Sequence, residues 1–192
     1  MSPINWKKDV CTIPNLLSLF RILIIPVYVT IYLSATKPVD YFLAAGILAI
    51  SCITDCIDGQ IARHFNMITT LGKILDPLAD KATQFTLIGC LVVKQPILRP
   101  ILILFIIKEG FQLIAAGIML SHGRMLKGAL FSGKICTSVL FISLIVLVMF
   151  PTLQQSIVTI ISFVDFIFLL ISFIDYVHAY FYRENVFQNT KH

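Results

Sequence analysis

Residues 55–80 decide how this chain is interpreted, and they read DCIDGQIARHFNMITTLGKILDPLAD. The stretch contains four aspartates in a chain that is otherwise rich in apolar residues. An aspartate at membrane depth costs about 2.5–3.5 kcal/mol on insertion scales, so such residues are functional candidates. These aspartates are Asp55, Asp58, Asp76 and Asp80.

The composition is that of an integral membrane protein. Of the 192 residues, 58% are hydrophobic and 13% are charged, which argues against a soluble domain. The formal net charge is +5. The basic residues form no long cluster and most of them flank apolar stretches, so we expect no nucleic-acid partner. A chain of this length fits one compact helical domain, which we predict to cover residues 1–192.

The spacing of the polar residues predicts two helices that face each other. One stripe of the first helix, at positions i, i+3, i+4, i+7 and i+8, carries Asp55, Asp58, Gly59, Ala62 and Arg63. One stripe of the second helix, at i, i+4 and i+8, carries Gly72, Asp76 and Asp80. A short turn between the helices would make them antiparallel. Four carboxylates that converge in this way repel one another unless they hold cations.

Six apolar segments are each near the roughly 20 residues that a bilayer-spanning helix requires. They cover residues 14–35, 41–63, 71–93, 97–121, 129–150 and 156–181. Pro38, Gly123 and Pro151 fall in or near the turns. Apolar and charged residues alternate around Trp6, which predicts a short interfacial helix. We therefore predict an all-α integral membrane protein with an interfacial segment (1–13), a bundle of six transmembrane helices (14–181) and a cytoplasmic tail (182–192).

The basic residues predict the orientation of this bundle. With the N-terminus inside, nine of them fall on the inner side: Lys7, Lys8, Arg63, Lys73, Arg124, Lys127, Lys134, Arg183 and Lys191. The outer connections hold three: Lys37, Lys94 and Arg99. This asymmetry favours an N-terminus inside the cell. Six spans then place the C-terminus and the aspartates on the cytoplasmic side as well.

Residues 55–80 match the pattern D-x2-D-G-x2-A-R-x8-G-x3-D-x3-D without a departure. This pattern resembles the signature of the CDP-alcohol phosphatidyltransferase family, and a match at fixed spacing across two spans is far more specific than a short motif. Residues 13–17 (IPNLL) with Arg21, and residues 75–81 (LDPLADK), resemble the phosphatidylglycerophosphate synthases and the related cardiolipin synthases. The resemblance covers the first half of the chain well and the second half weakly.

The resemblance implies an enzyme of phospholipid biosynthesis in a bacterial plasma membrane. Such an enzyme moves a phosphatidyl group from CDP-diacylglycerol to an alcohol acceptor and releases CMP. The family also implies six membrane helices, a homodimer and a divalent cation site. From the chemistry of the carboxylates we expect Mg²⁺ or Mn²⁺ there, with two ions that share bridging carboxylates.

Roles for the signature residues follow from their chemistry. Hard divalent cations prefer oxygen ligands, so the expected metal ligands are Asp55, Asp58, Asp76 and Asp80. Asp80 is also the candidate general base for the acceptor hydroxyl. Glycines let a nucleotide approach the backbone and arginine binds phosphate, so CDP binding is assigned to Asp58, Gly59, Ala62, Arg63 and Gly72. The alternative is a structural network of ion pairs with nearby lysines and arginines.

Basic residues around the turn between the fourth and fifth spans are candidates for the acceptor site. Arg124, Lys127 and Lys134 can hold a phosphate of the acceptor. Charge that merely flanks a cytoplasmic turn is the alternative for Arg124 and Lys127. Lys134 follows Gly133 at the start of a helix, and Gly-Lys at this place resembles the family.

The fourth span departs from the phosphatidylglycerophosphate synthase pattern. Those enzymes usually carry Arg-Glu there and a further arginine one or two turns later. Here the pair is Lys108-Glu109, and residues 113–117 read LIAAG. The run is somewhat similar to the cardiolipin synthase branch, whose acceptor is phosphatidylglycerol. We favour glycerol 3-phosphate as the acceptor, with phosphatidylglycerol or another alcohol as alternatives.

Two aspartates in the last span receive no catalytic role. Asp165 lies deep in the span, which predicts a partner on another helix. Asp175, with Tyr176 and His178, is expected to form local hydrogen bonds. A small ion- or proton-coupled transporter is the alternative from another class of protein. The acidic residues lie toward one membrane face and no internal repeat is evident, which favours the enzyme.

Overall fold

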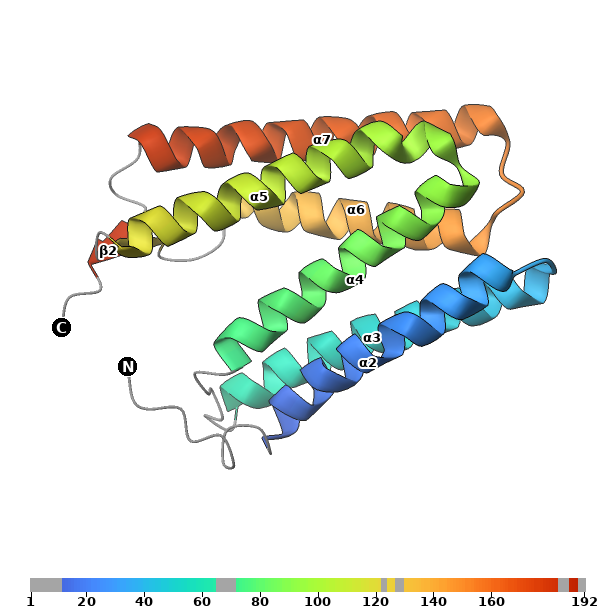
Figure 1. The fold of residues 1–192 in the computed structure, drawn as a ribbon, viewed down its shortest axis with the longest axis horizontal. Helices are drawn as coiled ribbons and strands as arrows, with labels where there is room; N and C mark the ends of the chain where they lie inside the picture. Colours follow the sequence, from blue (N-terminus) through green and yellow to red (C-terminus); the bar gives the residue numbers. More distant parts are fainter. Residues whose placement is uncertain (1–11, 65–71, 122–123, 127–129, 183–186, 190–192) are drawn as a thin grey trace. The chain divides into compact units, whose positions relative to one another are not determined.

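The structure is a computed structural model that describes residues 12–64, 72–121, 124–126, 130–182 and 187–189. Side chains are described for residues 12, 15–54, 75–119, 121 and 130–182. Figure 1 shows the elements in this part of the chain. In chain order they are α2 (Ile13–Ser34), α3 (Pro38–His64), α4 (Gly72–Lys94), the 3-10 turn η1 (Pro96–Leu98), α5 (Arg99–Ser121), β1 (Arg124–Leu126), α6 (Phe131–Met149), α7 (Gln155–Tyr182) and β2 (Phe187–Asn189).

Each of the six predicted spans coincides with one of these α-helices. Within the described residues, four stretches are long and apolar enough to cross a membrane: Asn15–Ser34, Pro96–Met119, Phe131–Met149 and Gln155–Tyr182. Helix α3 contributes a shorter apolar stretch, Pro38–Thr54. Helix α4 is less apolar, because Asp76, Asp80 and Lys81 lie in its first half. The chain therefore has the apolar helices of an integral membrane protein.

A pair of short strands is an exception to the all-α prediction. β1 and β2 pair in antiparallel fashion, with Arg124 opposite Asn189 and Leu126 opposite Phe187. No strand was predicted at either position, because three-residue strands leave no periodic signal. The predicted interfacial helix falls in residues 1–13, nearly all of which lie outside the described residues.

The chain divides into two compact units, which are described separately. Unit 1 comprises residues up to Leu91 together with Ile145–Thr152, and so contains α2, α3 and most of α4. Unit 2 comprises Val92–Leu144 and the residues from Leu153 onward. It contains η1, α5, most of α6, α7 and both strands.

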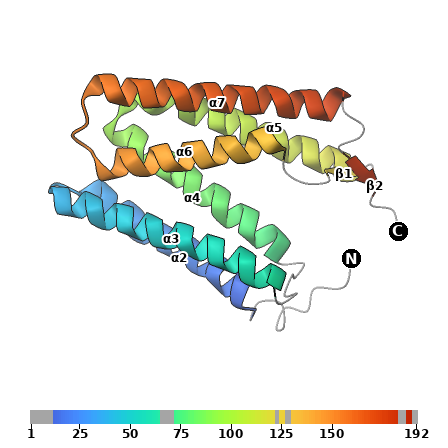
Figure 2. The same cartoon turned by 180° about the vertical axis from the view of Figure 1, so that it is seen from behind.

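In unit 1, α2 and α3 lie side by side as an antiparallel hairpin (Figures 1 and 2). The backbone amides of Thr36 and Lys37 donate to Oδ2 of Asp40 at 3.1 and 3.0 Å, which fixes the entry into α3. The ring of Tyr41 meets that of Tyr32 edge to face at a centroid distance of 5.8 Å. These contacts secure the start of α3, and the signature aspartates lie at its opposite end.

In unit 2, α7 packs against both α5 and α6. Phe111 of α5 meets Phe173 and Tyr180 of α7 edge to face, at centroid distances of 5.6 and 5.9 Å. Oγ of Ser143 on α6 lies 2.7 and 2.6 Å from the two carboxylate oxygens of Asp165 on α7. Asp165 is only 1% exposed. The prediction that this aspartate has a partner on another helix is thus confirmed.

Candidate active site

The backbone gives the signature residues the helical form that their spacing requires. Helix α3 continues through the first half of the signature as far as His64. Helix α4 begins at Gly72 and carries Asp76 and Asp80, one turn apart. Asp55 and Asp58 lie within α3, but their side chains fall outside the described set, as do those of Gly59, Ala62, Arg63 and Gly72.

Asp76 of α4 is bonded to helix α2. Oγ of Ser18 donates a hydrogen bond to Oδ1 of Asp76. Ser18 is completely buried, whereas Asp76 and Asp80 are half-buried. This bond joins residues 58 positions apart in the sequence. It fixes the orientation of one expected metal ligand, because a hydroxyl donor restricts how a carboxylate turns.

Ser18 belongs to a buried polar stripe on α2. Asn15 is 3% exposed and Arg21 is 2% exposed, and both lie on the same face as Ser18 at three-residue intervals. Buried polar groups on an apolar helix need partners inside the protein. The stripe therefore faces protein, and through Ser18 it contacts the aspartate-bearing part of α4.

The chemistry of the donors fits a divalent cation. Mg²⁺ and Mn²⁺ prefer carboxylate oxygens, and Asp76 and Asp80 present two carboxylates one turn apart on α4. A carboxylate with one hydroxyl donor keeps acceptor capacity for a metal. Among the described side chains, no three metal-ligating residues gather. Two of the four expected ligands, Asp55 and Asp58, lie outside that set.

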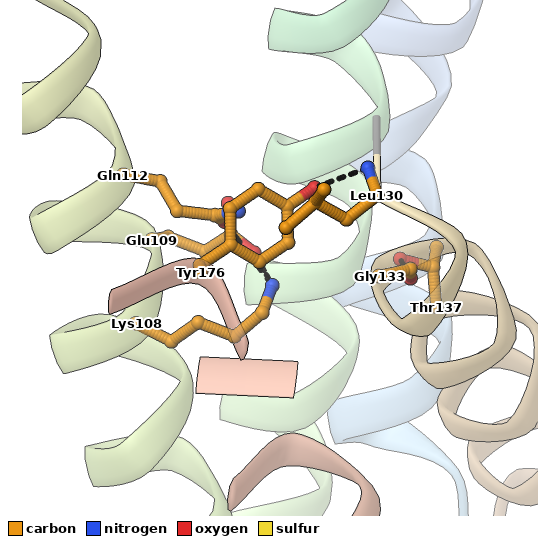
Figure 3. Close-up of polar contacts among 7 residues, drawn as sticks. All are labelled: Lys108, Glu109, Gln112, Leu130, Gly133, Thr137 and Tyr176. Carbon is orange, nitrogen blue, oxygen red and sulfur yellow. Dashed lines mark hydrogen bonds and ion pairs between the residues drawn. The ribbon is translucent and has the colours of Figure 1, made fainter. Parts of the chain in front are cut away.

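Unit 2 contains a buried polar cluster around Lys108 (Figure 3). The side chain of Lys108 is 3% exposed, and its Nζ lies 2.6 Å from Oε1 of Glu109. Nζ also donates to Oε1 of Gln112 at 3.2 Å and lies 5.7 Å from the ring centroid of Tyr176. A buried ammonium is tolerated when it is paired and hydrogen-bonded. The positive charge of Lys108 is thus largely neutralised within the protein.

The three basic residues predicted for the acceptor site differ in how far the structure describes them. Lys134 lies in the first turn of α6 and is exposed. Arg124 begins β1, and its side chain is outside the described set. Lys127 lies outside the described residues. Only Lys134 can therefore be placed as an exposed cation.

The start of α6 is held by α7. Oγ of Ser132 donates to Oδ2 of Asp175 at 2.6 Å, and the amide of Leu130 donates to the hydroxyl of Tyr176 at 3.3 Å. The partner in this bond lies 43 positions away from Asp175, so the bond is not one of the local hydrogen bonds predicted for that residue, and those stay a prediction. Helix packing brings a serine of α6 within reach of the carboxylate, so the bond crosses between helices.

A comparison with protein families settles the class of the chain. The family model described as CDP-alcohol phosphatidyltransferase matches residues 11–174, which includes the whole aspartate signature. The chain belongs to the CDP-alcohol phosphatidyltransferase family. This membership confirms the resemblance drawn from residues 55–80 and sets the transporter alternative aside.

Relatives carry the names of two activities within this family. A CDP-diacylglycerol–glycerol-3-phosphate 3-phosphatidyltransferase of Aquifex aeolicus is 30% identical over 171 residues, covering 85% of this chain and 93% of that protein. One of Rickettsia bellii is 42% identical over 82 residues, and this match spans only 42% of either chain. A CMP-forming cardiolipin synthase of Streptomyces coelicolor is 31% identical over 130 residues, covering 67% of this chain and 60% of that protein.

Sequence reasoning missed two residues that make contacts between elements, and one of them, Ser18, contacts the expected metal ligand Asp76. Ser18 was not singled out, although polar residues at 15, 18 and 21 in an apolar span form a detectable stripe. Tyr176 was assigned only local bonds, and it instead reaches Leu130 and the ammonium of Lys108. No sequence signal points to that contact, because an aromatic residue in an apolar helix is ordinary packing material.

Proposed function

We propose that this member of the family is a phosphatidylglycerophosphate synthase, which transfers the phosphatidyl group of CDP-diacylglycerol to glycerol 3-phosphate and releases CMP. The observation that carries this proposal is the relative of that name which covers 85% of this chain and 93% of its own length. A match over nearly the whole of both proteins includes the second half, where the acceptor must be distinguished.

The proposed metal site consists of the carboxylates of Asp55, Asp58, Asp76 and Asp80, which would hold two ions of Mg²⁺ or Mn²⁺. When bound, the cations neutralise negative charge on the diphosphate and on the departing CMP. The bond from Ser18 supports this assignment, since it orients Asp76 as a ligand. A cluster of carboxylates without cations would be costly at membrane depth.

In the proposed reaction, Asp80 takes the proton of the acceptor hydroxyl. The acceptor oxygen then forms a bond to the phosphorus of the phosphatidyl group, and the bond from this phosphorus to the oxygen of CMP breaks. The departing CMP takes up the electron pair of that bond. The nucleotide is held by Asp58, Gly59, Ala62, Arg63 and Gly72. In that set, arginine pairs with phosphate and the small residues leave room for the ligand.

The proposed acceptor site includes Lys134, with Arg124 and Lys127 as further cations. Lys134 is exposed, so its ammonium is accessible to a phosphorylated ligand. Lys108 is a poor candidate, because Glu109 and Gln112 already engage its ammonium. Binding of a phosphate to Lys108 would require those contacts to be exchanged.

A cardiolipin synthase that uses phosphatidylglycerol is the second candidate. This candidate is favoured by the absence of an arginine from the stretch of the fourth span where phosphatidylglycerophosphate synthases usually carry an additional one. Here that stretch contains Leu113 and Ile114, whose side chains are 77% and 67% exposed. Apolar side chains on the outside of α5 suit a lipid environment and offer nothing to a phosphate. The Streptomyces relative carries the name of this activity.

The arrangement in the membrane is part of the proposal. All six α-helices cross the bilayer of a bacterial plasma membrane, and both termini and the aspartates lie on the cytoplasmic side. The protein acts as a homodimer. Residues 1–192 form one functional domain, which is supported by a family match that runs through both units.

An acceptor panel tests the proposed function. Purified protein in lipid receives CDP-diacylglycerol, Mg²⁺ or Mn²⁺, and one alcohol at a time: glycerol 3-phosphate, phosphatidylglycerol, inositol, inositol phosphate or serine. Release of CMP is the readout. Release with glycerol 3-phosphate alone is the expected result. Release with phosphatidylglycerol alone would instead establish the cardiolipin synthase, and release with none would overturn both candidates.

A further inference from the structure

Tyr176 occupies a central place at the junction of α5, α6 and α7. Its ring faces the ammonium of Lys108 on α5 (Figure 3). Its hydroxyl accepts a hydrogen bond from the amide of Leu130, the residue that directly precedes α6. The side chain is 7% exposed. None of the roles assigned above uses this residue, although it contacts groups from both neighbouring helices of unit 2.

The backbone of Leu130 links Tyr176 to Lys134. Its amide donates to the Tyr176 hydroxyl at 3.3 Å, and its carbonyl accepts from the backbone amide of Lys134 at 3.2 Å. The first turn of α6 is thus bonded at its origin to a side chain of α7. A helix end otherwise frays, because its first amides have no partners within the helix. The bond to Tyr176 therefore holds the backbone from which Lys134 projects.

Gly133 makes this arrangement possible. A Cβ atom at this position would lie 2.8 Å from the hydroxyl oxygen of Tyr176 and 2.9 Å from its Cε2. Cβ atoms essentially never approach other heavy atoms this closely, so the tyrosine side chain would have to shift. The carbonyl of Gly133 also accepts a bond from Oγ1 of Thr137 at 2.9 Å, so the hydroxyl of Thr137 is satisfied within the helix. The lack of a side chain at Gly133 thus leaves room for the ring and hydroxyl of Tyr176.

A second contact holds the same turn. Oγ of Ser132 donates to the carboxylate of Asp175, the residue before Tyr176. Two consecutive residues of α7 therefore bond to the two residues that flank Phe131 at the start of α6. A mere packing contact between helices would not need two directed hydrogen bonds at the very turn that carries the exposed lysine.

We infer that Tyr176 is a positioning residue for acceptor binding, which fixes the first turn of α6 through Leu130 and thereby sets where Lys134 meets the phosphate of the acceptor. The inference rests on the function proposed above. The specificity for the acceptor then depends partly on α7, through a residue that does not itself touch the substrate.

Two substitutions test this inference. Tyr176→Phe removes the hydroxyl but keeps the ring, and Gly133→Ala displaces the ring. Each should raise the KM for glycerol 3-phosphate about five- to tenfold, as the loss of one hydrogen bond implies, and leave the KM for CDP-diacylglycerol within about twofold. Matched controls are Tyr182→Phe, an exposed tyrosine of the same helix, and Gly110→Ala, where a Cβ would meet no atom within 4 Å.

A double-mutant cycle separates positioning from general damage. If Tyr176 acts through Lys134, then Tyr176→Phe should have no further effect on the acceptor KM in a Lys134→Ala background. Additive effects, or equal effects on both substrates, would overturn the inference. If Lys134→Ala alone leaves the acceptor KM unchanged, the proposed acceptor site fails and the inference about specificity fails with it.

Hydrogen exchange gives a readout that does not depend on turnover. The amides of Leu130 and Lys134 should exchange faster in Tyr176→Phe than in the parent protein, whereas amides in the middle of α6 should be unchanged. Unchanged exchange at both positions would refute the positioning role even in an active enzyme. Faster exchange in a protein inactive with every acceptor would uphold the contact and place the failure in the proposed function.

Discussion

The substitution Glu109→Gln should destabilise the protein more than an ordinary surface change. The carboxylate of Glu109 lies 2.6 Å from Nζ of Lys108, with side chains that are 18% and 3% exposed respectively. Removing one partner from a buried pair costs about 3–5 kcal/mol. The amide oxygen introduced by Glu109→Gln still accepts a hydrogen bond from the ammonium, which recovers roughly 1 kcal/mol. The expected loss of unfolding free energy is therefore about 2–4 kcal/mol.

Thermal unfolding followed by circular dichroism in detergent measures this loss. For a chain of this size it corresponds to a fall in Tm of about 4–16 °C. The double variant Lys108→Met/Glu109→Met is the matched control, because replacing both charges with apolar groups of similar length is close to neutral. A Tm for Glu109→Gln equal to that of the parent protein would refute the reasoning. A double variant as unstable as the single one would do the same, since the loss would then come from packing and not from an unpaired charge.

Three further predictions concern the proposed site. Asp80→Asn should abolish CMP release while CDP-diacylglycerol still binds, as measured by calorimetry; full activity would rule out Asp80 as the base. Lys134→Ala should raise the KM for glycerol 3-phosphate at least tenfold, roughly the cost of a lost charge-assisted bond, with little change for the CDP-lipid; a parallel rise for both substrates would contradict an acceptor site. Ser18→Ala should raise the Mg²⁺ concentration for half-maximal activity about tenfold, since Ser18 orients Asp76; an unchanged titration curve would show that this bond is only structural.

The helices and the signature were predictable because both depend on local patterns. Apolar runs of near-span length, bounded by prolines and glycines, gave α2 to α7 within a few residues of their observed ends. Helical spacing likewise placed Asp76 and Asp80 on one stripe of α4. In both cases the information lies within about 25 neighbouring residues, where periodicity can be read directly.

The contacts between helices could not be predicted from the same patterns. Ser18 reaches Asp76 across 58 positions, and Leu130 reaches Tyr176 across 46. Which serine meets which carboxylate depends on how the helices rotate and cross, and side-chain packing sets that geometry. The polarity of each residue was visible in the sequence, but its partner was not. The β1–β2 pair was missed for a related reason, since its strands are too short to show alternation.

The different environments of Lys108 and Lys134 in unit 2 affect which acceptor the protein can bind. Lys108 lies within the fourth predicted span and is neutralised by Glu109, whereas Lys134 is exposed at the start of α6. A ligand phosphate gains little from a cation that must first break its own buried ion pair. A phosphorylated acceptor would therefore depend on exposed cations such as Lys134. If the proposed function holds, discrimination between glycerol 3-phosphate and phosphatidylglycerol depends mainly on the first turn of α6 and on Tyr176, which anchors that turn. The Lys108-Glu109 pair of the fourth span then contributes less to this discrimination.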